Sequence, residues 1–481
     1  MSAEHDDLLP AAPSVAGTVF ARPHFIAIGG MGMSGLARIC VARGATVSGS
    51  DANDSPQLAT LRALGCSVHV GHDAAHLPAA ATCVVRSTAI RADNPELVAA
   101  RDRGLPVLHR AELLAALMEG YRAIAIAGTH GKSSTSSMLA GALEGLGLDP
   151  SFAIGADPSG PGSNARHGGG ELFVAEADES DRSFHNYRPS VAVVLNIEED
   201  HHDHYASLAD HLDSYALFAE RIRPGGTLIV SADDAGAREL TARLARSRPE
   251  LRVVTYGSAA DAAVRIDDIT VAVDGSTVTV SLPDGDPVTF AVAVPGAHMA
   301  HNAVAALAAG RAAGVPVGRL AGALTRYQGI KRRFTTMGDA RGVRVVDSYA
   351  HHPTEVRADL ATARTVADAR DGRVVAVFQP HLYSRTAALG ADIGRALAGA
   401  DVAVVLAIFG SREDPVAGVT HDIVVDAARA AGVDVHPVED FSKAPAIVAD
   451  LVTAGDLIVT MGAGSVTTLG PLILDELTSG N

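Results

Sequence analysis

Residues Gly128-Thr129-His130-Gly131-Lys132-Ser133 have the types and the spacing that bind a polyphosphate. An Ala- and Ile-rich run over 123–127 predicts a buried strand before them, and the apolar periodicity of 138–146 predicts a helix after them. In a strand, glycine loop and helix of this kind, backbone N–H groups and the helix N-terminus face an anion. Lys132 can then reach the terminal phosphates, and the Ser133 hydroxyl can bind Mg²⁺.

This motif departs from the usual phosphate-binding pattern, which requires glycine where the chain has Ile126. The alternative is a glycine turn beside an unrelated lysine. The chain has only three lysines (132, 331 and 443) against 36 arginines. Because nearly every other cation is arginine, the lysine kept at this helix start favours the phosphate site.

Two acidic segments follow strands that come later in the sequence. The apolar run 172–175 leads into Glu-Ala-Asp-Glu-Ser-Asp at 176–181, and the run 191–195 leads into Asn-Ile-Glu-Glu-Asp-His-His-Asp-His at 196–204. Carboxylates at strand ends after a phosphate loop are expected Mg²⁺ ligands. Each segment alone could be a solvated acidic turn. Two of them, each closing a buried strand, favour a metal site.

A second glycine-rich loop lies near the N-terminus. A β-like run over 24–28 precedes Gly30-Met31-Gly32-Met33-Ser34-Gly35, a helix is predicted through Arg43, and Asp51 follows a second strand. Alone, this pattern would indicate a dinucleotide site. Physically it requires only a diphosphate at a helix N-terminus and a carboxylate near a ribose.

The elements that position these motifs alternate between strand and helix, which predicts an α/β protein built of open sheets. Strands and helices alternate to about residue 118, and again from about 332 with strands at 343–347, 374–378, 402–406 and 457–460. Residues 264–294 alternate with period two and predict a small antiparallel insertion. A Gly/Pro/Ser-rich loop at 157–170 is long enough to be functional. In the last sheet, the segments after three strands, 348–355, 379–385 and 462–465, are expected to face one cleft.

Length and composition set the outer limits. The 481 residues allow about three domains, each with its own core. The net charge of −16 argues against non-specific binding to nucleic acid or to an anionic membrane. We expect a flexible tail at 1–18, no signal peptide, and no apolar run near the ~20 residues that span a bilayer. The cysteines at 40, 66 and 83 are expected to be buried free thiols of a cytoplasmic protein.

Taken together, the motifs resemble the Mur ligases, from about residue 24 to 470 and in order. Within the family, the chain is most similar to the members that attach L-alanine to UDP-N-acetylmuramate. The resemblance rests on the glycine loop at 28–35, the short phosphate loop, the acidic segments at 176–181 and 196–201, Arg332-Arg333-Phe334, His351-His352-Pro353-Thr354-Glu355, and the segments 379–385 and 462–465.

The resemblance implies three domains: a Rossmann-like domain at 19–120 for the UDP-sugar, a central P-loop ATPase-type domain at 121–331 with a small antiparallel sheet, and a Rossmann-like C-terminal domain at 332–481 for the amino acid. It also implies ATP-driven amide formation through an acyl phosphate. The implied ligands are UDP-N-acetylmuramate, L-alanine, ATP and two Mg²⁺ ions, for which Mn²⁺ can substitute. The implied state is a monomer or weak homodimer.

The resemblance also assigns roles to individual residues. The catalytic set is Lys132, Glu176, His201, Arg333, His351 and Arg385. ATP contacts are Gly128, Thr129, His130, Gly131, Lys132, Ser133, Ser134, His298, Asn302 and Arg333, with Mg²⁺ held by Ser133, Glu176 and His201. The UDP-sugar and alanine contacts are Gly30, Gly32, Met33, Ser34, Gly35, Asp51, Ser87, Tyr349, His351, His381 and Arg385.

Several positions depart from the family pattern. Ser133 stands where threonine is usual, Met299 replaces an asparagine, Ser348 and Ala350 replace an acidic residue and a glycine, and Leu382 replaces a basic residue. Ligases that add later amino acids carry a carbamylated lysine in the ATP domain. Alignment of 215–219 puts Ala219 at that position, and no lysine occurs between 132 and 331.

Three alternative functions stay open on the sequence alone. One is a ligase that recycles whole murein peptides onto the same UDP-sugar, although the Gly-Met-Gly-Met-Ser-Gly segment resembles the alanine-adding type. Another is a P-loop switch or binding ATPase without ligase activity. A nicotinamide dehydrogenase would leave the second and third domains unexplained.

Overall fold

The structure is a computed structural model that describes residues 17–160, 162–201, 204–411 and 413–479. Most of the predicted tail at 1–18 lies outside the described residues. The chain groups into two compact units. Unit 1 comprises 1–266, 280–288 and 302–326, and unit 2 comprises 267–279, 289–301 and 327–481. The described helices include none long and apolar enough to cross a membrane.

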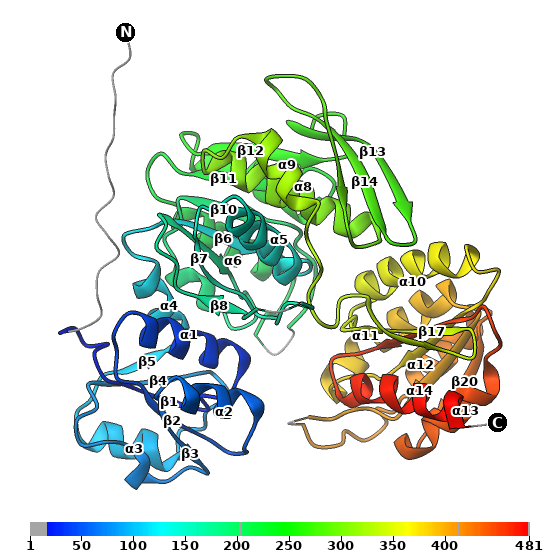
Figure 1. Cartoon of the computed structure of the whole chain (residues 1–481), viewed down its shortest axis with the longest axis horizontal. Coiled ribbons are helices and arrows are strands. Elements are labelled where there is room, and N and C mark those ends of the chain that lie inside the picture. The colour runs from blue at the N-terminus through cyan, green and yellow to red at the C-terminus, as the bar shows by residue number, and fades with distance from the viewer. Residues whose placement is uncertain (1–16, 161, 202–203, 412, 480–481) are drawn as a thin grey trace. The chain divides into compact units, whose positions relative to one another are not determined.

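The first sheet of unit 1 is parallel, with the strand order β3-β2-β1-β4-β5. Helices cover both of its faces, as Figure 1 shows, and the right-handed crossovers of such folds leave the strand ends free for ligands. Its elements are β1 (Pro23–Ile26), α1 (Met31–Ala42), β2 (Ser48–Asp51), α2 (Pro56–Ala63), β3 (Ser67–Val70), β4 (Cys83–Arg86), α3 (Pro95–Asp102), β5 (Val107–His109) and α4 (Arg110–Met118).

The second sheet of unit 1 places the strand before the phosphate loop at its centre. In the order β12-β11-β10-β6-β9-β7-β8, strand β6 pairs in parallel with both β10 and β9. The strands are β6 (Arg122–Ala127), β7 (Ser151–Ala153), β8 (Ala165–Arg166), β9 (Leu172–Glu176), β10 (Val191–Val194), β11 (Thr227–Ser231) and β12 (Arg252–Gly257). The ends of β9 and β10 therefore flank the glycine loop after β6, as both acidic segments require.

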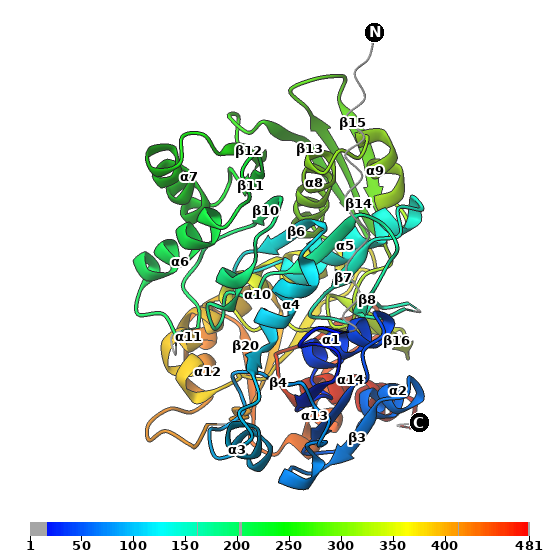
Figure 2. The same cartoon turned by 90° about the vertical axis from the view of Figure 1, so that its left-hand side faces the viewer.

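Helices lie on both faces of this second sheet. Figure 2 shows α6 and α7 on one side of β6, β10 and β11, with α5 and α9 on the other. The helices are α5 (Lys132–Gly145), α6 (Leu208–Glu220), α7 (Ala235–Ser247) and α9 (Val317–Leu324), while α8 (Ala297–Ala312) runs across the division between the units. One buried apolar cluster extends from Phe25 to Leu251, so the two sheets of unit 1 share a core.

The period-two pattern over 264–294 forms three strands, β13 (Val264–Ala272), β14 (Gly275–Ser281) and β15 (Val288–Val292). These strands are neighbours in the order β15-β14-β13. Only Val273 and Asp274 connect β13 to β14, and a two-residue connection joins antiparallel strands. The predicted antiparallel strands are therefore present, but they extend the sheet of β6 beyond β12 to ten strands instead of forming a small separate sheet, and β13 pairs with β12 in parallel.

Unit 2 contains a six-stranded sheet of order β16-β17-β21-β18-β19-β20, parallel except for the β16–β17 pair. Its strands are β16 (Thr335–Ala340), β17 (Val343–Ser348), β18 (Val374–Phe378), β19 (Val402–Leu406), β20 (Asp434–Val438) and β21 (Leu457–Met461). Alternate residues of the fully buried β18 enter separate apolar clusters, because helices cover both faces. The helices are α10 (Pro353–Asp368), α11 (Tyr383–Ala396), α12 (Asp422–Ala430), α13 (Ala444–Leu451) and α14 (Leu469–Ser479).

All three cysteines are buried and free, as predicted. Burial raises the pKa of the Cys40 and Cys83 thiols to about 12, so neither is a thiolate at neutral pH. The predicted helix over 138–146 begins earlier than its apolar pattern, at Lys132.

Candidate active site

The phosphate loop turns sharply between β6 and α5. Gly128 and Gly131 adopt φ values of 143° and 84°, a region that other residues rarely enter. A Cβ on Gly131 would lie 2.6 Å from Oδ1 of Asn302, so the predicted nucleotide residue Asn302 lies directly against the loop. Asn196, at the end of β10, fixes the loop from the other side. Its Oδ1 accepts the His130 N–H at 2.7 Å.

Lys132 is the first residue of α5, and its amine points back over the loop. Nζ donates to the carbonyls of Gly128 and Thr129, at 2.7 and 3.2 Å, and to Glu179 at 2.9 Å. Burial opposes the charge of the amine, but the carboxylates of Glu179, Asp178 and Glu176 together outweigh burial and raise the pKa of Lys132. The phosphate loop therefore holds a charged amine at neutral pH, beside the N-terminus of α5.

Ser133 and Glu176, both predicted metal ligands, lie close together, as a shared metal site requires. The Ser133 hydroxyl donates to Oε1 of Glu176 at 3.0 Å, and Oε2 accepts the Gly155 N–H at 2.6 Å. Burial raises the pKa of Glu176, with Lys132 and these hydrogen bonds opposing it. A serine oxygen and a buried carboxylate beside a phosphate loop are the oxygen donors that Mg²⁺ prefers. Ser134, the next residue of α5, is buried.

His201 follows β10 and lies near the same carboxylate as Lys132. Its Nε2 is 3.5 Å from Glu179 and 3.8 Å from Asp200. Burial alone would lower the pKa of His201, but the two carboxylates outweigh the effect of burial and raise this pKa. His201 has a φ of 50°, an uncommon backbone conformation for a residue other than glycine.

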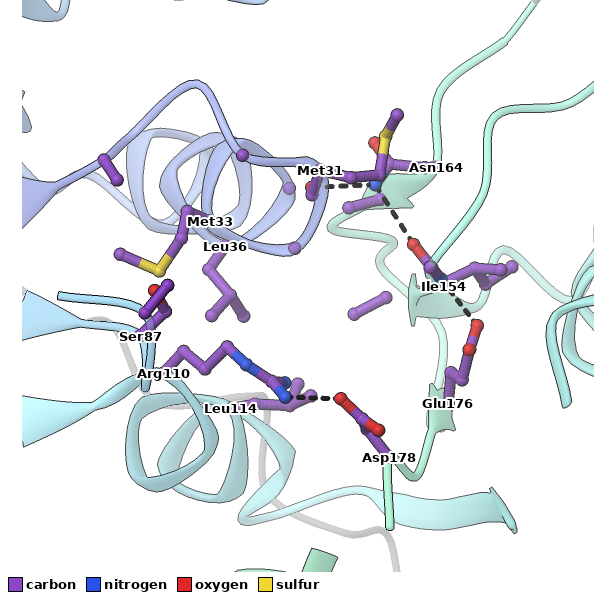
Figure 3. A pocket seen from close by; sticks show the side chains of 18 residues that line it. Met31, Met33, Leu36, Ser87, Arg110, Leu114, Ile154, Asn164, Glu176 and Asp178 are labelled. Carbon is purple, nitrogen blue, oxygen red and sulfur yellow. Dashed lines mark hydrogen bonds and ion pairs between the residues drawn. The ribbon is translucent and has the colours of Figure 1, made fainter. Parts of the chain in front are cut away.

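The N-terminal glycine loop opens into a cavity of about 430 Å³ that also reaches the end of β9. Figure 3 shows Met33 and Ser87 on one side of this cavity and Glu176 on another. The predicted residues Gly30, Gly32, Met33, Gly35 and Ser87 line it.

Two other predicted UDP-sugar residues lie outside the cavity lining. Ser34 is fully buried, and its hydroxyl donates to the Met31 carbonyl. Asp51 accepts the Gly29 N–H at 2.9 Å, so it supports the glycine loop.

Two residues of the site were given no individual role by the sequence analysis. Glu179 is fully buried and joins Lys132 to His201. Arg110 lines the cavity and donates from Nη2 to Asp178 at 2.6 Å. The acidic segment 176–181 was a sufficient signal for Glu179, whereas a single arginine among 36 gives no signal for Arg110.

In unit 2, two arginines stack on one aromatic ring. The guanidinium carbons of Arg332 and Arg333 lie 4.8 and 5.5 Å from the Tyr349 ring centroid. Arg333 also pairs with Glu355 at 3.4 Å. His351 lies beside this group, with Nδ1 2.9 Å from the Tyr349 carbonyl. The predicted residues Arg333, Tyr349 and His351 therefore form one cluster.

The three loops after β17, β21 and β18 meet at one edge of the sheet of unit 2. Gln379 Oε1 accepts the Val466 N–H at 2.9 Å, which joins the loops after β18 and β21. Arg332, which precedes β16, donates to the Gly462 carbonyl at 2.6 Å and its own carbonyl accepts the Tyr349 N–H at 2.7 Å, so it links the loops after β21 and β17. His381 stacks on Phe409 with ring centroids 5.9 Å apart. Arg385, in the first turns of α11, is half-buried.

His298 lies at the start of α8, where burial lowers its pKa to about 4 and leaves the imidazole neutral at neutral pH. Its Nε2 is 3.6 Å from Oδ1 of Asp359. The Ser348 hydroxyl donates to the other oxygen of that carboxylate. Met299, the departure beside His298, is buried in the helix.

Comparison with known proteins gives a consistent result along the whole chain. Three family models match in order: the Mur ligase family, catalytic domain, at 22–122, the Mur ligase middle domain at 126–310, and the Mur ligase, glutamate ligase domain, at 332–464. A curated UDP-N-acetylmuramate–L-alanine ligase of Streptomyces coelicolor is 60% identical over 460 residues, which are 96% of this chain and 98% of that protein. The protein of the same name from Streptomyces griseus is 58% identical, over 95% and 98%.

Solved structures agree with this result. The chain is similar to a UDP-N-acetylmuramate-alanine ligase from Thermotoga maritima, with a TM-score of 0.79, 26% identity, and coverage of 96% of this chain and 100% of that one. A murein peptide ligase from Psychrobacter arcticus has a TM-score of 0.69 at 24% identity, over 95% and 99%. The second likeness concerns the fold alone.

Proposed function

This chain belongs to the Mur ligase family, and on that premise we propose how it performs the reaction named for its relatives. It is an ATP-dependent ligase that joins L-alanine to the carboxylate of UDP-N-acetylmuramate and releases ADP and phosphate. One observation carries the proposal for the site. Glu176 lines the cavity of the N-terminal glycine loop and also accepts the hydroxyl of Ser133 in the phosphate loop.

The chemistry requires that arrangement. A carboxylate is a poor electrophile, so it must first take the γ-phosphoryl group of ATP to become an acyl phosphate. The amine of L-alanine then attacks the acyl carbon, and phosphate leaves with the bonding electron pair. Because the first step brings two anions together, it needs cations and preorganised hydrogen-bond donors at the γ-phosphate.

The phosphate loop supplies those groups. Gly128, Thr129, His130 and Gly131 bind the phosphates through the backbone, and Lys132 holds the terminal phosphates in exchange for part of its contact with Glu179. The 2.9 Å Lys132–Glu179 pair supports this role, because it keeps the amine charged and oriented.

Two Mg²⁺ ions fit the oxygen and nitrogen donors of this site. Ser133 and Glu176 would hold one, and His201, with Glu179 beside it, would help to hold the other. Bound there, Mg²⁺ or Mn²⁺ would neutralise phosphate charge and polarise the γ-phosphoryl group.

Nucleotide and amino-acid contacts are proposed for the remaining predicted residues. His298 and Asn302 would contact adenine, with neutral His298 able to accept a hydrogen bond. Arg333 would reach the γ-phosphate. Tyr349, His351, His381 and Arg385 would lie around the incoming alanine and the reacting carboxylate, with His381 and Arg385 binding the alanine. The clustering of Arg333, Tyr349 and His351 supports the assignment within unit 2.

A single assay tests the function against its alternatives. Purified protein is given ATP, Mg²⁺ and UDP-N-acetylmuramate, with L-alanine, glycine, L-serine or L-alanyl-γ-D-glutamyl-meso-diaminopimelate, and phosphate release and products are followed. We expect turnover with L-alanine and little with the tripeptide. Preference for the tripeptide would indicate a recycling ligase, and phosphate release without product would indicate a P-loop ATPase.

Three finer assignments complete the proposal. The reaction takes place in the cytoplasm, where its nucleotide substrates are made. The protein acts as a monomer or weak homodimer. Its partners are small molecules rather than nucleic acid, in line with a net charge of −16.

A further inference from the structure

The cavity of unit 1 is lined by more negative than positive side chains, although its proposed substrate is an anion. Its described lining contains three charged residues, Arg110, Glu176 and Asp178. A substrate that carries both a diphosphate and a carboxylate must therefore enter a space with two carboxylates and one cation. The place and orientation of that cation decide where the substrate's own carboxylate can lie.

Arg110 is held firmly from one side. It is the first residue of α4, whose start is fixed by a capping box between His109 and Glu112. Its Nη2 donates to Asp178 at 2.6 Å and lies 3.5 Å from Asp181. Burial opposes its charge, but Asp178 and Asp181 outweigh burial and raise the pKa of Arg110. The guanidinium is therefore charged and fixed in place.

The other side of the guanidinium has N–H donors that can bind a ligand. An arginine has five N–H donors. Among the described residues, Arg110 has no hydrogen-bond acceptor for Nε or Nη1, and neither atom is sealed from solvent. Figure 3 shows the side chain extending along the cavity from α4 toward Asp178, with Glu176 on the wall beyond. A planar fork with free donors suits a carboxylate, which it can bind through two parallel hydrogen bonds.

We propose that Arg110 binds the carboxylate of UDP-N-acetylmuramate and orients it beside Glu176 for phosphorylation. This inference rests on the proposed function. The glycine loop takes the diphosphate, and Arg110, which carries the only positive charge among the described lining residues, binds the carboxylate. Asp178 then acts as a positioning residue, because it holds Nη2 and leaves the remaining donors facing the substrate.

The test compares two sugars that differ at the carboxylate. UDP-N-acetylglucosamine has the same nucleotide and acetylamino group as UDP-N-acetylmuramate but lacks the lactyl ether and its carboxylate. Both are titrated calorimetrically into the full-length protein without ATP. In Arg110→Gln we expect the affinity for UDP-N-acetylmuramate to fall about 10- to 100-fold, the value of a hydrogen bond to a charged group, with affinity for UDP-N-acetylglucosamine nearly unchanged.

Two variants act as controls. Arg38→Gln removes a nearby cation whose partners are Ser163 and Asn164 and which is not part of the cavity lining. We expect it to leave the preference between the sugars unchanged. Asp178→Asn removes the negative charge beside Arg110 but keeps an oxygen that can accept from Nη2, so the guanidinium should stay in place and most of the preference should remain. If it instead loses the preference as fully as Arg110→Gln, the ion pair has a structural role and the inference is overturned.

The remaining outcomes separate this inference from the proposed function. If the wild-type protein does not prefer the sugar with the carboxylate, the proposed function fails. If the wild type prefers it and Arg110→Gln retains the preference, or loses affinity for both sugars equally, the inference alone fails. Should Arg110→Gln not fold, Arg110→Lys keeps the charge without the fork. It should weaken only UDP-N-acetylmuramate, by several-fold.

Discussion

Lys132 and Glu179 balance one another inside unit 1. Glu179 is fully buried, and its carboxylate is 2.9 Å from the amine. A buried charge that loses its partner costs several kcal/mol. Removing either residue alone would therefore leave an uncompensated buried charge. The pair thus keeps the amine in place, and in the proposed function the phosphates of ATP would compete with Glu179 for it.

We predict that Lys132→Ala abolishes turnover but leaves UDP-N-acetylmuramate affinity within a few-fold of wild type, because Lys132 does not line the sugar cavity. Phosphate release and calorimetric titration measure the two effects. Lys443→Ala is the matched control, since that lysine is 72% exposed and lies in unit 2. An equal loss of sugar affinity in Lys132→Ala would contradict the separation of the two sites.

The second prediction concerns metal. Glu176→Gln and His201→Ala should each lower activity by more than ~10-fold at low Mg²⁺, with partial recovery at high Mg²⁺, because each removes a proposed ligand. Thermal unfolding should change little for His201→Ala, whose side chain is partly exposed. Activity measured against Mg²⁺ concentration decides the matter. Unchanged Mg²⁺ dependence in both variants would make these residues structural.

Asp359 gives a prediction about stability and pH. Burial raises the pKa of this carboxyl to about 6, more than the Ser348 hydrogen bond lowers it. The folded state therefore holds the proton more tightly than the unfolded chain. Its stabilising effect is present at low pH and is lost as pH rises through 6, when an ionised carboxylate costs up to about 3 kcal/mol.

Asp359→Asn should accordingly raise the thermal midpoint, and by more at pH 7.5 than at pH 5. Asp456→Asn is the control of opposite sign. Burial opposes ionisation of Asp456, but its ion pair with Arg373 outweighs burial and lowers the pKa of Asp456, so its loss should destabilise at pH 7.5. Equal shifts of Asp359→Asn at both pH values would show that the pKa of Asp359 is not raised.

At the scale of elements, the sequence pattern predicts the central strands of the unit 2 sheet well and its edge strands poorly. β18 is buried along its length, so its apolar run is unambiguous. β20 and β16 are the two edges of the same sheet. β20 contains Pro437, and β16 includes a register shift near Gly338, so neither shows a clear strand pattern.

Among the candidate site residues, those in a local motif could be predicted, and pairs distant in sequence could not. The phosphate loop is local, and Gly128 to Ser133 could be identified without tertiary information. The Arg110–Asp178 hydrogen bond joins residues 68 apart, and Lys132–Glu179 joins residues 47 apart. Such pairs arise from the order of strands in a sheet, which residue spacing alone does not determine.

Helix α6 has alanine, Ala219, at the position where related ligases have a carbamylated lysine. Ala219 is fully buried in α6, and Tyr215, one turn earlier, is fully buried as well. A methyl group cannot be carbamylated, and no lysine lies between 132 and 331 to replace it. We therefore predict that turnover is indifferent to bicarbonate. The measurement is activity near pH 6 in carbon-dioxide-depleted buffer with and without bicarbonate, and a several-fold recovery on its addition would contradict this expectation.

At the scale of the molecule, the proposed binding groups divide between the two units. The sugar cavity and the phosphate loop both belong to unit 1, whereas the proposed ATP contacts His298 and Arg333 and the proposed alanine contacts His381 and Arg385 belong to unit 2. The alanine contacts can be tested separately from the ATP contacts, because the reaction has two steps. Forming the acyl phosphate needs the sugar carboxylate and ATP, while the second step alone needs L-alanine.

We therefore predict that His381→Ala and Arg385→Ala impair ligation but retain acyl phosphate formation. In a single turnover without L-alanine, hydroxylamine converts an acyl phosphate to a hydroxamate, which can be quantified beside ADP. Both variants should form hydroxamate at rates within a few-fold of wild type, yet require much more L-alanine for ligation. Lys132→Ala should form none, because its defect precedes the intermediate. If either variant also fails to form hydroxamate, its side chain acts on the phosphoryl transfer and its assignment to the L-alanine step alone is wrong.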